Sequence, residues 1–434
     1  MPPALPAAPS PPRTRMNALT SYLLAQGARR PLQTLRFCAA EALRRSRWQR
    51  AVAANGVSLE AHADWAERLR PFAPGAIPVS GAAQCEDAAV IAQADHISEG
   101  ELQIFGQRIG FGLAPDWHTD WVTGYRWPLS RQVRLQDGPP GTDIKRPWEA
   151  ARFHHGLRLA QAWRVTREPR YAADFAHQVS HWLQHNPYPR GIHWAMPMEA
   201  ALRVINWISA AALLGDAPLD PEFCRRFLAA LHLHGRHILA RREWNPVARS
   251  NHYLACVAGI LFCGIALRDT SEGRYWLQFG RRALAEEMLA QVDADGVAHE
   301  GSSGYHLFVA ELFLTAALAA ARLDSLEHGA NGASGSQRAQ LARSWGDAFT
   351  ARLEKMFEFA TALAAERPAP PAWGDSDDGR VLPLCAEPAH HAHHLLAVAG
   401  ALFERADFHS GHACREPLWR LGASLSPTRA RPAA

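Results

Sequence analysis

Two kinds of helical segment alternate along this chain, and the alternation limits the folds available to it. The stretches 196–214, 251–267 and 305–323 are apolar on nearly every side, so each needs neighbours all round. The stretches 221–242 and 271–292 lie between them and carry one charged and one apolar face. An inner helix followed by an outer helix, repeated, is typical of a double ring of antiparallel helices. We therefore predict an all-α fold, an incomplete (α/α) toroid.

Polar clusters precede the predicted inner helices. They read KRPWEAARFHH (145–155), GIHWAMPMEAALR (191–203), RSNHY (249–253) and HEGSSGYH (299–306), and a fifth, PAWGDSDDGR (371–380), follows a helix predicted over about 336–365. Successive inner helices should point the same way, because each interval between them holds two helices and two turns. Their N-terminal ends would then meet at one rim, where exposed N–H groups favour an anionic ligand. Trp148, Trp194 and Trp373 offer flat faces for sugar rings there.

Composition narrows the class of protein. With 434 residues, 48% of them hydrophobic and 20% charged, the chain can bury a core in one large domain or two ordinary ones. The net charge of +4 is small, and no basic run with interleaved aromatics suggests a nucleic-acid partner. No segment has 18 uninterrupted apolar residues, so we expect no membrane span. Seven cysteines without a CxxC pair predict a disulfide-free protein.

We predict three parts along the chain. Residues 1–90 form an Arg- and Ala-rich lead-in that is irregular and partly disordered, 91–415 form the toroid, and 416–434 form a disordered tail. Within the toroid domain, residues 96–140 alternate in polarity and are rich in Gly, Pro and Trp, which predicts a hairpin and irregular loops. The N-terminus has no clean apolar region before a cleavage site, so it shows no clear secretory signal.

Six of these segments carry a resemblance to a known family. WHTDWVTGYRWP, DIKRPWEAARF, HWAMPMEAALRVINW, SNHYLACVAGILF, DGVAHEGSSGYHLFVAELF and WGDSDDGR are similar, in order and spacing, to the toroid domain of the heparinase II/III family of polysaccharide lyases. The resemblance covers roughly residues 95–410, and its specific part is Asn251 and His252 followed by Tyr305. It implies a lyase that cleaves an acidic, uronate-containing polysaccharide, a glycosaminoglycan or exopolysaccharide, by β-elimination without cofactor or metal. It also implies the periplasm or cell envelope, whereas the N-terminus leaves the cytoplasm open.

The resemblance also implies residue roles. Asn251 and His252 would hydrogen-bond the uronate carboxylate and stabilise the charge that develops on it. Tyr305 would accept the α proton, donate a proton to the leaving oxygen, or do both. The predicted substrate-binding residues lie in the same polar clusters: Lys145, Trp148, His193, Trp194, Glu199, Arg203, Glu300, His306, Trp373, Asp375 and Arg380.

Simpler structural roles compete with some of these assignments. Asn251 could cap its helix through its side-chain oxygen. Ser302 or Ser303 is better explained as a helix cap than as a nucleophile, because no Ser-His-Asp arrangement is visible. Glu199 and Arg203 have the i, i+4 spacing of a helix salt bridge, or they order the rim together.

The acidic loop and the histidine run have simpler explanations too. Asp375, Asp377 and Asp378 look like a metal-binding run, but we favour a turn whose acids hold Arg380 and neighbouring histidines. The run HHAHH, 390–394, could gather imidazoles on one helical face, and we favour an exposed helix start instead.

Two other functions stay open. Family lyases usually continue into a C-terminal β-sheet domain that supplies another histidine and a wall of the cleft, and we find no strand-patterned segment after residue 415. That wall would come from a second chain, or the chain is a non-catalytic glycan-binding toroid. An inverting glycoside hydrolase is the other alternative, with Glu300 and either Asp375 or Asp377 as the paired carboxylates.

Overall fold

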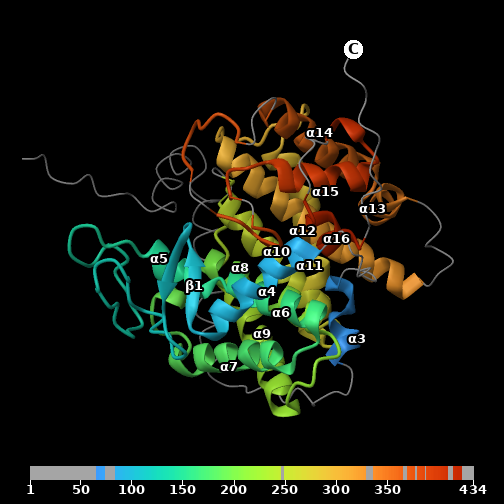
Figure 1. The fold of residues 1–434 in the computed structure, drawn as a ribbon. Helices are drawn as coiled ribbons and strands as arrows, with labels where there is room; N and C mark the ends of the chain where they lie inside the picture. Colours follow the sequence, from blue (N-terminus) through green and yellow to red (C-terminus); the bar gives the residue numbers. More distant parts are fainter. Residues whose placement is uncertain are drawn as a thin grey trace, which may run out of the picture. The chain divides into compact units, whose positions relative to one another are not determined.

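The structure is a computed structural model. It describes residues 65–73, 84–245, 249–328, 336–364, 369–376, 379–386, 388–408 and 414–422. The chain divides into one unit of Met1–Ala54 with Trp244–Arg249 and a larger unit of Asn55–Glu243 with Ser250–Ala434. In the described part of the smaller unit, the Arg249 guanidinium lies over the Trp244 ring. The larger unit is built almost wholly of helices (Figure 1).

The helices of the larger unit form the predicted double layer. The inner helices are α6 (His154–Thr166), α8 (Pro197–Leu214), α10 (Asn251–Ala266) and α12 (Ser303–His328), each packed against the next. The outer helices are α7 (Pro169–His185), α9 (Pro221–Arg241), α11 (Ser271–Gln291), α13 (Gln337–Trp345) and α14 (Asp347–Ala364). Each outer helix packs on an inner one, and every residue of α8 is buried. The all-α toroid prediction is therefore confirmed.

Small residues let α10 approach both of its neighbours closely. A Cβ added at Gly259 would lie 2.7 Å from the Cβ of Ala201 on α8, and one added at Gly264 would lie 2.4 Å from the backbone nitrogen of Leu277 on α11. Both distances are far below van der Waals contact, so these glycines set how near the helices lie.

One helix in the described part of the chain, α12, is long and apolar enough to cross a membrane. Its most apolar 18-residue window is 94% buried inside the structure. The position of α12 in the inner layer, with helices on all sides, therefore accounts for its apolar sequence.

The remaining elements lie before α6 and after α14, except for the short helix η3. They are α3 (Trp65–Leu69), η1 (Arg70–Phe72), α4 (Gln84–Ser98), β1 (Glu101–Ile104), β2 (Gln107–Gly110), α5 (Lys145–Ala151), η3 (Ile192–Trp194, between α7 and α8), α15 (His393–Phe403), η5 (Ala406–Phe408) and α16 (Glu416–Leu421). The two strands pair antiparallel. Phe105 and Gly106 join them with φ of 50° and 72°, the two positive values that a tight hairpin turn needs. The predicted hairpin is confirmed.

Two sequence predictions need correction. The single helix predicted over 336–365 is broken between α13 and α14 at Gly346, whose φ of 82° is incompatible with a continuous helix. The ordered structure also passes both predicted domain boundaries, since α3 and α4 begin before residue 91 and α16 follows 415. Within α16, Glu416, Trp419 and Arg420 are buried, so the prediction of a disordered tail is wrong for 416–421. Residues 1–64 of the predicted lead-in lie outside the described residues.

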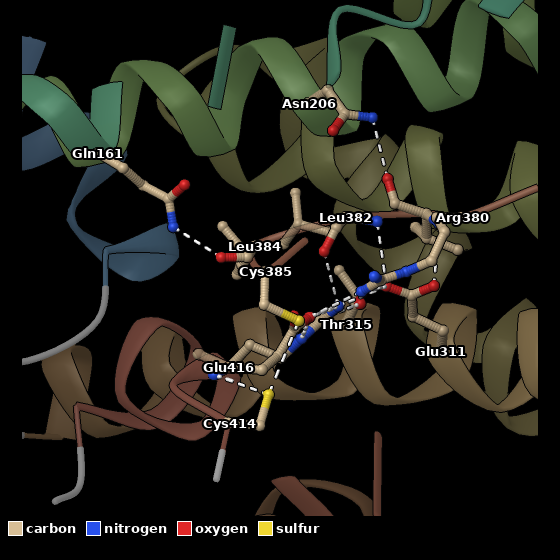
Figure 2. Close-up of polar contacts among 12 residues, drawn as sticks. Gln161, Asn206, Glu311, Thr315, Arg380, Leu382, Leu384, Cys385, Cys414 and Glu416 are labelled. Carbon is tan, nitrogen blue, oxygen red and sulfur yellow. Dashed lines mark hydrogen bonds and ion pairs between the residues drawn. The ribbon is translucent and has the colours of Figure 1, made fainter. Parts of the chain in front are cut away.

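An extended segment, residues 380–385, crosses the inner helices (Figure 2). Buried polar side chains from three inner helices, Gln161 of α6, Asn206 of α8 and Glu311 of α12, hydrogen-bond its backbone. Gln161 donates to Leu384 O at 2.9 Å, Asn206 donates to Val381 O at 2.9 Å, and Glu311 accepts from the N–H groups of Val381 at 3.0 Å and Leu382 at 3.1 Å. Otherwise apolar helices therefore carry polar residues here because the segment has backbone groups to satisfy.

Candidate functional site

The first turns of α10 and α12 are joined by one carboxylate. Glu300, three residues before α12 begins, accepts from the backbone N–H of Asn251, the first residue of α10. It also accepts from Asn251 Nδ2 at 2.7 Å. A carboxylate at a helix N-terminus is favourable because it meets unpaired N–H groups and the positive end of the helix dipole.

Asn251 is oriented by this contact and does not cap its helix. Ser250 is the cap, since its Oγ accepts from Tyr253 N at 3.5 Å. An amide side chain has two N–H groups, and the bond to Glu300 uses one of them. Asn251 is 5% exposed, so its amide is held in one place at the start of α10.

His252 is the neighbouring candidate and is more exposed. Its side chain is 43% exposed, and Nδ1 lies 3.2 Å from Glu243 Oε1. Burial opposes a charge on this ring. The hydrogen bond and charge of Glu243, with Glu199 and Glu300 farther off, outweigh burial, so the pKa of His252 is raised above its ordinary value. The Glu243 carboxylate therefore favours the charged form of this ring.

Tyr305 lies in the first turn of α12, facing the loop 369–376. Ser302 caps this helix, because its Oγ accepts from Tyr305 N at 3.1 Å, and the predicted capping role of that serine is confirmed. The Tyr305 hydroxyl donates to Asp375 Oδ2 at 3.4 Å. Ser303 N donates to Trp373 O at 3.2 Å, and Trp373 N donates to the Ser303 hydroxyl at 3.3 Å, which fixes the loop over the turn. Here Trp373 is 42% exposed and Asp375 is exposed, as a substrate contact requires.

A chain of ion pairs leads away from this rim. Glu199, in the first turn of α8, forms two bonds of 2.8 Å with Arg152, so its predicted pairing with Arg203 is wrong. Arg152 also binds Glu149 at 2.6 Å, and Glu149 lies 3.0 Å from His154 Nδ1. These groups position one another through charge-assisted bonds.

A cavity of about 490 Å³ lies where this chain of ion pairs ends. Its wall includes ionisable side chains from several elements, among them Arg108, Glu149, His154, Arg158 and His390. The cavity therefore offers both positive and negative groups to a polar ligand.

Three predicted sugar-binding residues belong to the core instead. Trp148 is 9% exposed, and its indole donates to Ile192 O at 3.1 Å. Trp194 is 2% exposed and donates to Asn186 O at 3.0 Å, while His193 is fully buried against Trp117 O at 2.6 Å. All three side chains are turned into the fold, so they present no surface to a polysaccharide.

Arg203 and His306 are buried as well. The Arg203 guanidinium lies 4.1 Å from the centre of the Trp182 ring, and burial lowers its pKa to about 9. His306 Nε2 lies 3.0 Å from Met356 O, and burial lowers its pKa to about 4. Neither can act on a substrate. Lys145 is exposed at the start of α5, so its predicted role stays a prediction.

Arg380 is buried and pairs with α16 and α12. Its guanidinium binds Glu416 at 3.1 Å, with Glu311 at 3.7 Å. Asp375 accepts from Tyr305, and Asp377 and Asp378 lie outside the described residues, so the predicted pairing of Arg380 with the acidic loop stays a prediction. In the histidine run, α15 does begin at His393, but His394 is buried and not exposed.

Two residues of the rim were not predicted. Glu243 follows the last turn of α9, where the helix dipole disfavours a carboxylate. This unfavourable position was the signal in the sequence that Glu243 has a partner elsewhere. Arg152 lies inside the cluster 145–155, but only the contact with Glu199 reveals its role. Both side chains orient groups that the sequence had already marked.

Comparison with protein families identifies the chain. The model of the heparinase II/III N-terminus matches residues 115–382, more than half of the chain, including Asn251, His252 and Tyr305. The heparin-sulfate lyase of Pedobacter heparinus is 26% identical over 191 residues, 43% of this chain and 28% of that protein. The heparin-sulfate lyase of Bacteroides stercoris is 25% identical over 199 residues, 41% of this chain and 29% of that protein.

Solved structures are similar at lower identity. The heparan sulfate lyase HepC from Pedobacter heparinus has 19% identity and a TM-score of 0.48, over 82% of this chain and 48% of that one. A heparinase III has 15% identity and a TM-score of 0.47, over 84% of this chain and 47% of that one. The chain thus spans about half the length of these structures, and less than a third of each curated relative is matched. Because the family model covers most of it, the chain belongs to the heparinase II/III family.

Proposed function

We propose that the chain carries the toroid part of a polysaccharide lyase that cleaves an acidic, uronate-containing glycan by β-elimination. The observation that carries this proposal is the contact between Glu300 and Asn251, which joins the helix start bearing Asn251 and His252 to the helix start bearing Tyr305. This contact supports the proposal that an amide, an imidazole with a raised pKa and a phenol share one rim.

The reaction explains why these groups are needed. The hydrogen α to a uronate carboxylate is hard to remove, because a second negative charge builds up as it leaves. A positive imidazole at His252 and the second N–H of Asn251 would stabilise that charge where it forms. Glu243 supports this role, since it favours the charged form of His252.

Tyr305 is the proposed proton-transfer group. The C–H bond α to the carboxylate and the C–O bond β to it break, and a double bond forms between the two carbons. Tyr305 would give its phenolic proton to the leaving glycosidic oxygen, and the phenolate oxygen so formed would take the α proton, which restores the hydroxyl. Asp375 accepts from the Tyr305 hydroxyl and would orient it toward the sugar.

The relatives suggest which substrate to test first. Heparan sulfate is the first glycan to test, because the curated relatives are named heparin-sulfate lyases. We also propose that a further segment or a second chain closes the cleft, and that the protein acts in the periplasm or cell envelope.

Product analysis tests the proposal. The full chain is incubated with heparan sulfate, other uronate polymers and a neutral glucan, and the ultraviolet absorbance of unsaturated uronate is followed. We expect a rise with a uronate polymer only, and a loss of about 100-fold or more in Tyr305→Phe. Tyr275→Phe is the matched control, because Tyr275 is 55% exposed on outer helix α11.

Other outcomes would favour the alternatives. New reducing ends without unsaturation would indicate a hydrolase, although both oxygens of Glu300 are already engaged by Asn251. Retention on immobilised glycan without any product would indicate a binding toroid.

A further inference from the structure

Two cysteines from separate segments lie side by side near the buried ion pair of Arg380 with Glu416. Cys385 ends the segment that crosses the inner helices, and Cys414 precedes α16. Their sulfur atoms are 3.7 Å apart, and the Cys414 thiol donates toward Cys385 (Figure 2). A disulfide needs about 2.05 Å between the sulfurs, so the two sulfur atoms must come closer for the bond to form.

The surrounding contacts hold both segments in place for such a bond. Arg380 binds Glu416 at 3.1 Å, which ties the crossing segment to the first turn of α16. The Glu416 N–H donates to Cys414 Sγ at 3.4 Å. The ion pair and this hydrogen bond hold the two segments together beside the sulfurs.

Access comes from the cavity near the candidate site. Cys385 lines this space of about 490 Å³ and is only partly buried, whereas Cys414 is 7% exposed. A small oxidant can therefore reach Cys385 first. Cys256 and Cys263 on α10 are buried among apolar neighbours and have no such route.

We propose that Cys385 and Cys414 form a disulfide when the chain meets a small-molecule disulfide such as oxidised glutathione. The Cys385 thiolate attacks a sulfur of the small disulfide, releasing one small thiol and forming a mixed disulfide. The Cys414 thiolate then displaces the second small thiol. Two protein thiols are oxidised, one small disulfide is reduced to two thiols, and the new bond ties α16 to the crossing segment.

The hydrogen bond shared with Cys414, together with burial and the nearby Glu416 charge, raises the pKa of the Cys385 thiol. Thiolate attack is correspondingly slow at neutral pH. The test must therefore allow long incubation.

Thiol mapping tests this bond. The folded full chain is incubated with oxidised glutathione or with dithiothreitol, alkylated after unfolding, and digested for mass spectrometry. We expect a cross-linked peptide pair containing Cys385 and Cys414 after oxidation only. The oxidised chain should melt about 3–5 °C higher than the reduced chain, because the bond closes a loop in the unfolded state.

Matched variants distinguish the Cys385–Cys414 disulfide from oxidation of other cysteines. Cys224→Ser removes a partly buried cysteine of α9 and should leave both the cross-link and the melting shift intact. Cys414→Ser should abolish both and leave Cys385 bound to glutathione, and Cys414→Ala serves if the serine variant does not fold. Alkylation of Cys385 and Cys414 after oxidation of the folded wild-type chain would overturn the proposal. So would a cross-link of either one to a different cysteine.

Discussion

At the scale of single residues, Glu300 connects the two halves of the candidate site. Glu300→Gln removes the charge and replaces one acceptor oxygen with a donor facing the Asn251 N–H groups. We expect a loss of about 1–3 kcal/mol in the free energy of unfolding and a fall in lyase activity, because Asn251 loses its orientation. Chemical denaturation and initial rates measure both effects.

Glu327→Gln is the control for that change. Glu327 is exposed near the other end of α12, so its substitution should alter neither quantity. Unchanged stability and activity in Glu300→Gln would show that the contact with Asn251 does not position the amide.

The ion pair of His252 with Glu243 predicts a pH-dependent effect. The pKa of His252 is raised in the folded chain, so its stabilising contribution is fully present below the ordinary histidine pKa of 6.5. The contribution is lost as pH rises through the folded-state pKa. Glu243→Gln should therefore lower the melting temperature more at pH about 5.5 than at pH about 8.5.

NMR titration of the His252 ring provides the direct measurement. In Glu243→Gln its pKa should fall relative to the wild-type chain, because the largest favourable partner is gone. Equal ring pKa values in the two proteins would contradict the assignment.

At the scale of helices, close approach of α10 and α11 depends on glycine. In Gly264→Ala the new Cβ would lie 2.4 Å from the Leu277 backbone nitrogen, which cannot move as a side chain can. We expect a loss of about 1–3 kcal/mol in the free energy of unfolding. Gly110→Ala is the control, because nothing lies within 4 Å of a Cβ added there and its φ is ordinary. Equal stabilities in urea would refute this packing argument.

At the scale of the whole molecule, a buried ion cluster joins the last helix to the inner layer. Glu416 is fully buried between Arg380 and Arg420, and Glu311 pairs with the same two arginines. Removing one partner leaves a buried charge uncompensated. Glu416→Gln should therefore cost about 3–5 kcal/mol, whereas Glu168→Gln, in an exposed pair, should cost about 0–1 kcal/mol.

The same cluster predicts how the chain responds to acid. Burial alone would raise the pKa of Glu311 and Glu416, but Arg380 and Arg420 hold both values below the ordinary 4.5. Their contribution to stability is present above that value and is lost as pH falls through the lowered pKa values. The melting temperature should drop steeply below pH about 4.5, and a flat profile down to pH about 3 would contradict the pairing.

The sequence by itself determined the helix types, their order and the family. Apolar residues on every side of 196–214, 251–267 and 305–323 can be satisfied only by burial, and that requirement is local enough to read from one segment. The polar residues at the N-terminal ends of those helices predicted the rim. The helices start at regular intervals along the chain, so they point the same way and their starts lie together.

Only the tertiary structure decided which polar residues face solvent. Trp148, His193 and Arg203 stand beside the site residues in the sequence, yet packing of α5, η3 and α8 turns them inward. Partners far apart in the chain, such as Glu300 with Asn251 or Glu416 with Arg380, are invisible to local patterns. Exposure and pairing depend on which segments pack together. The residue type alone does not tell whether a polar side chain contacts water or a buried partner.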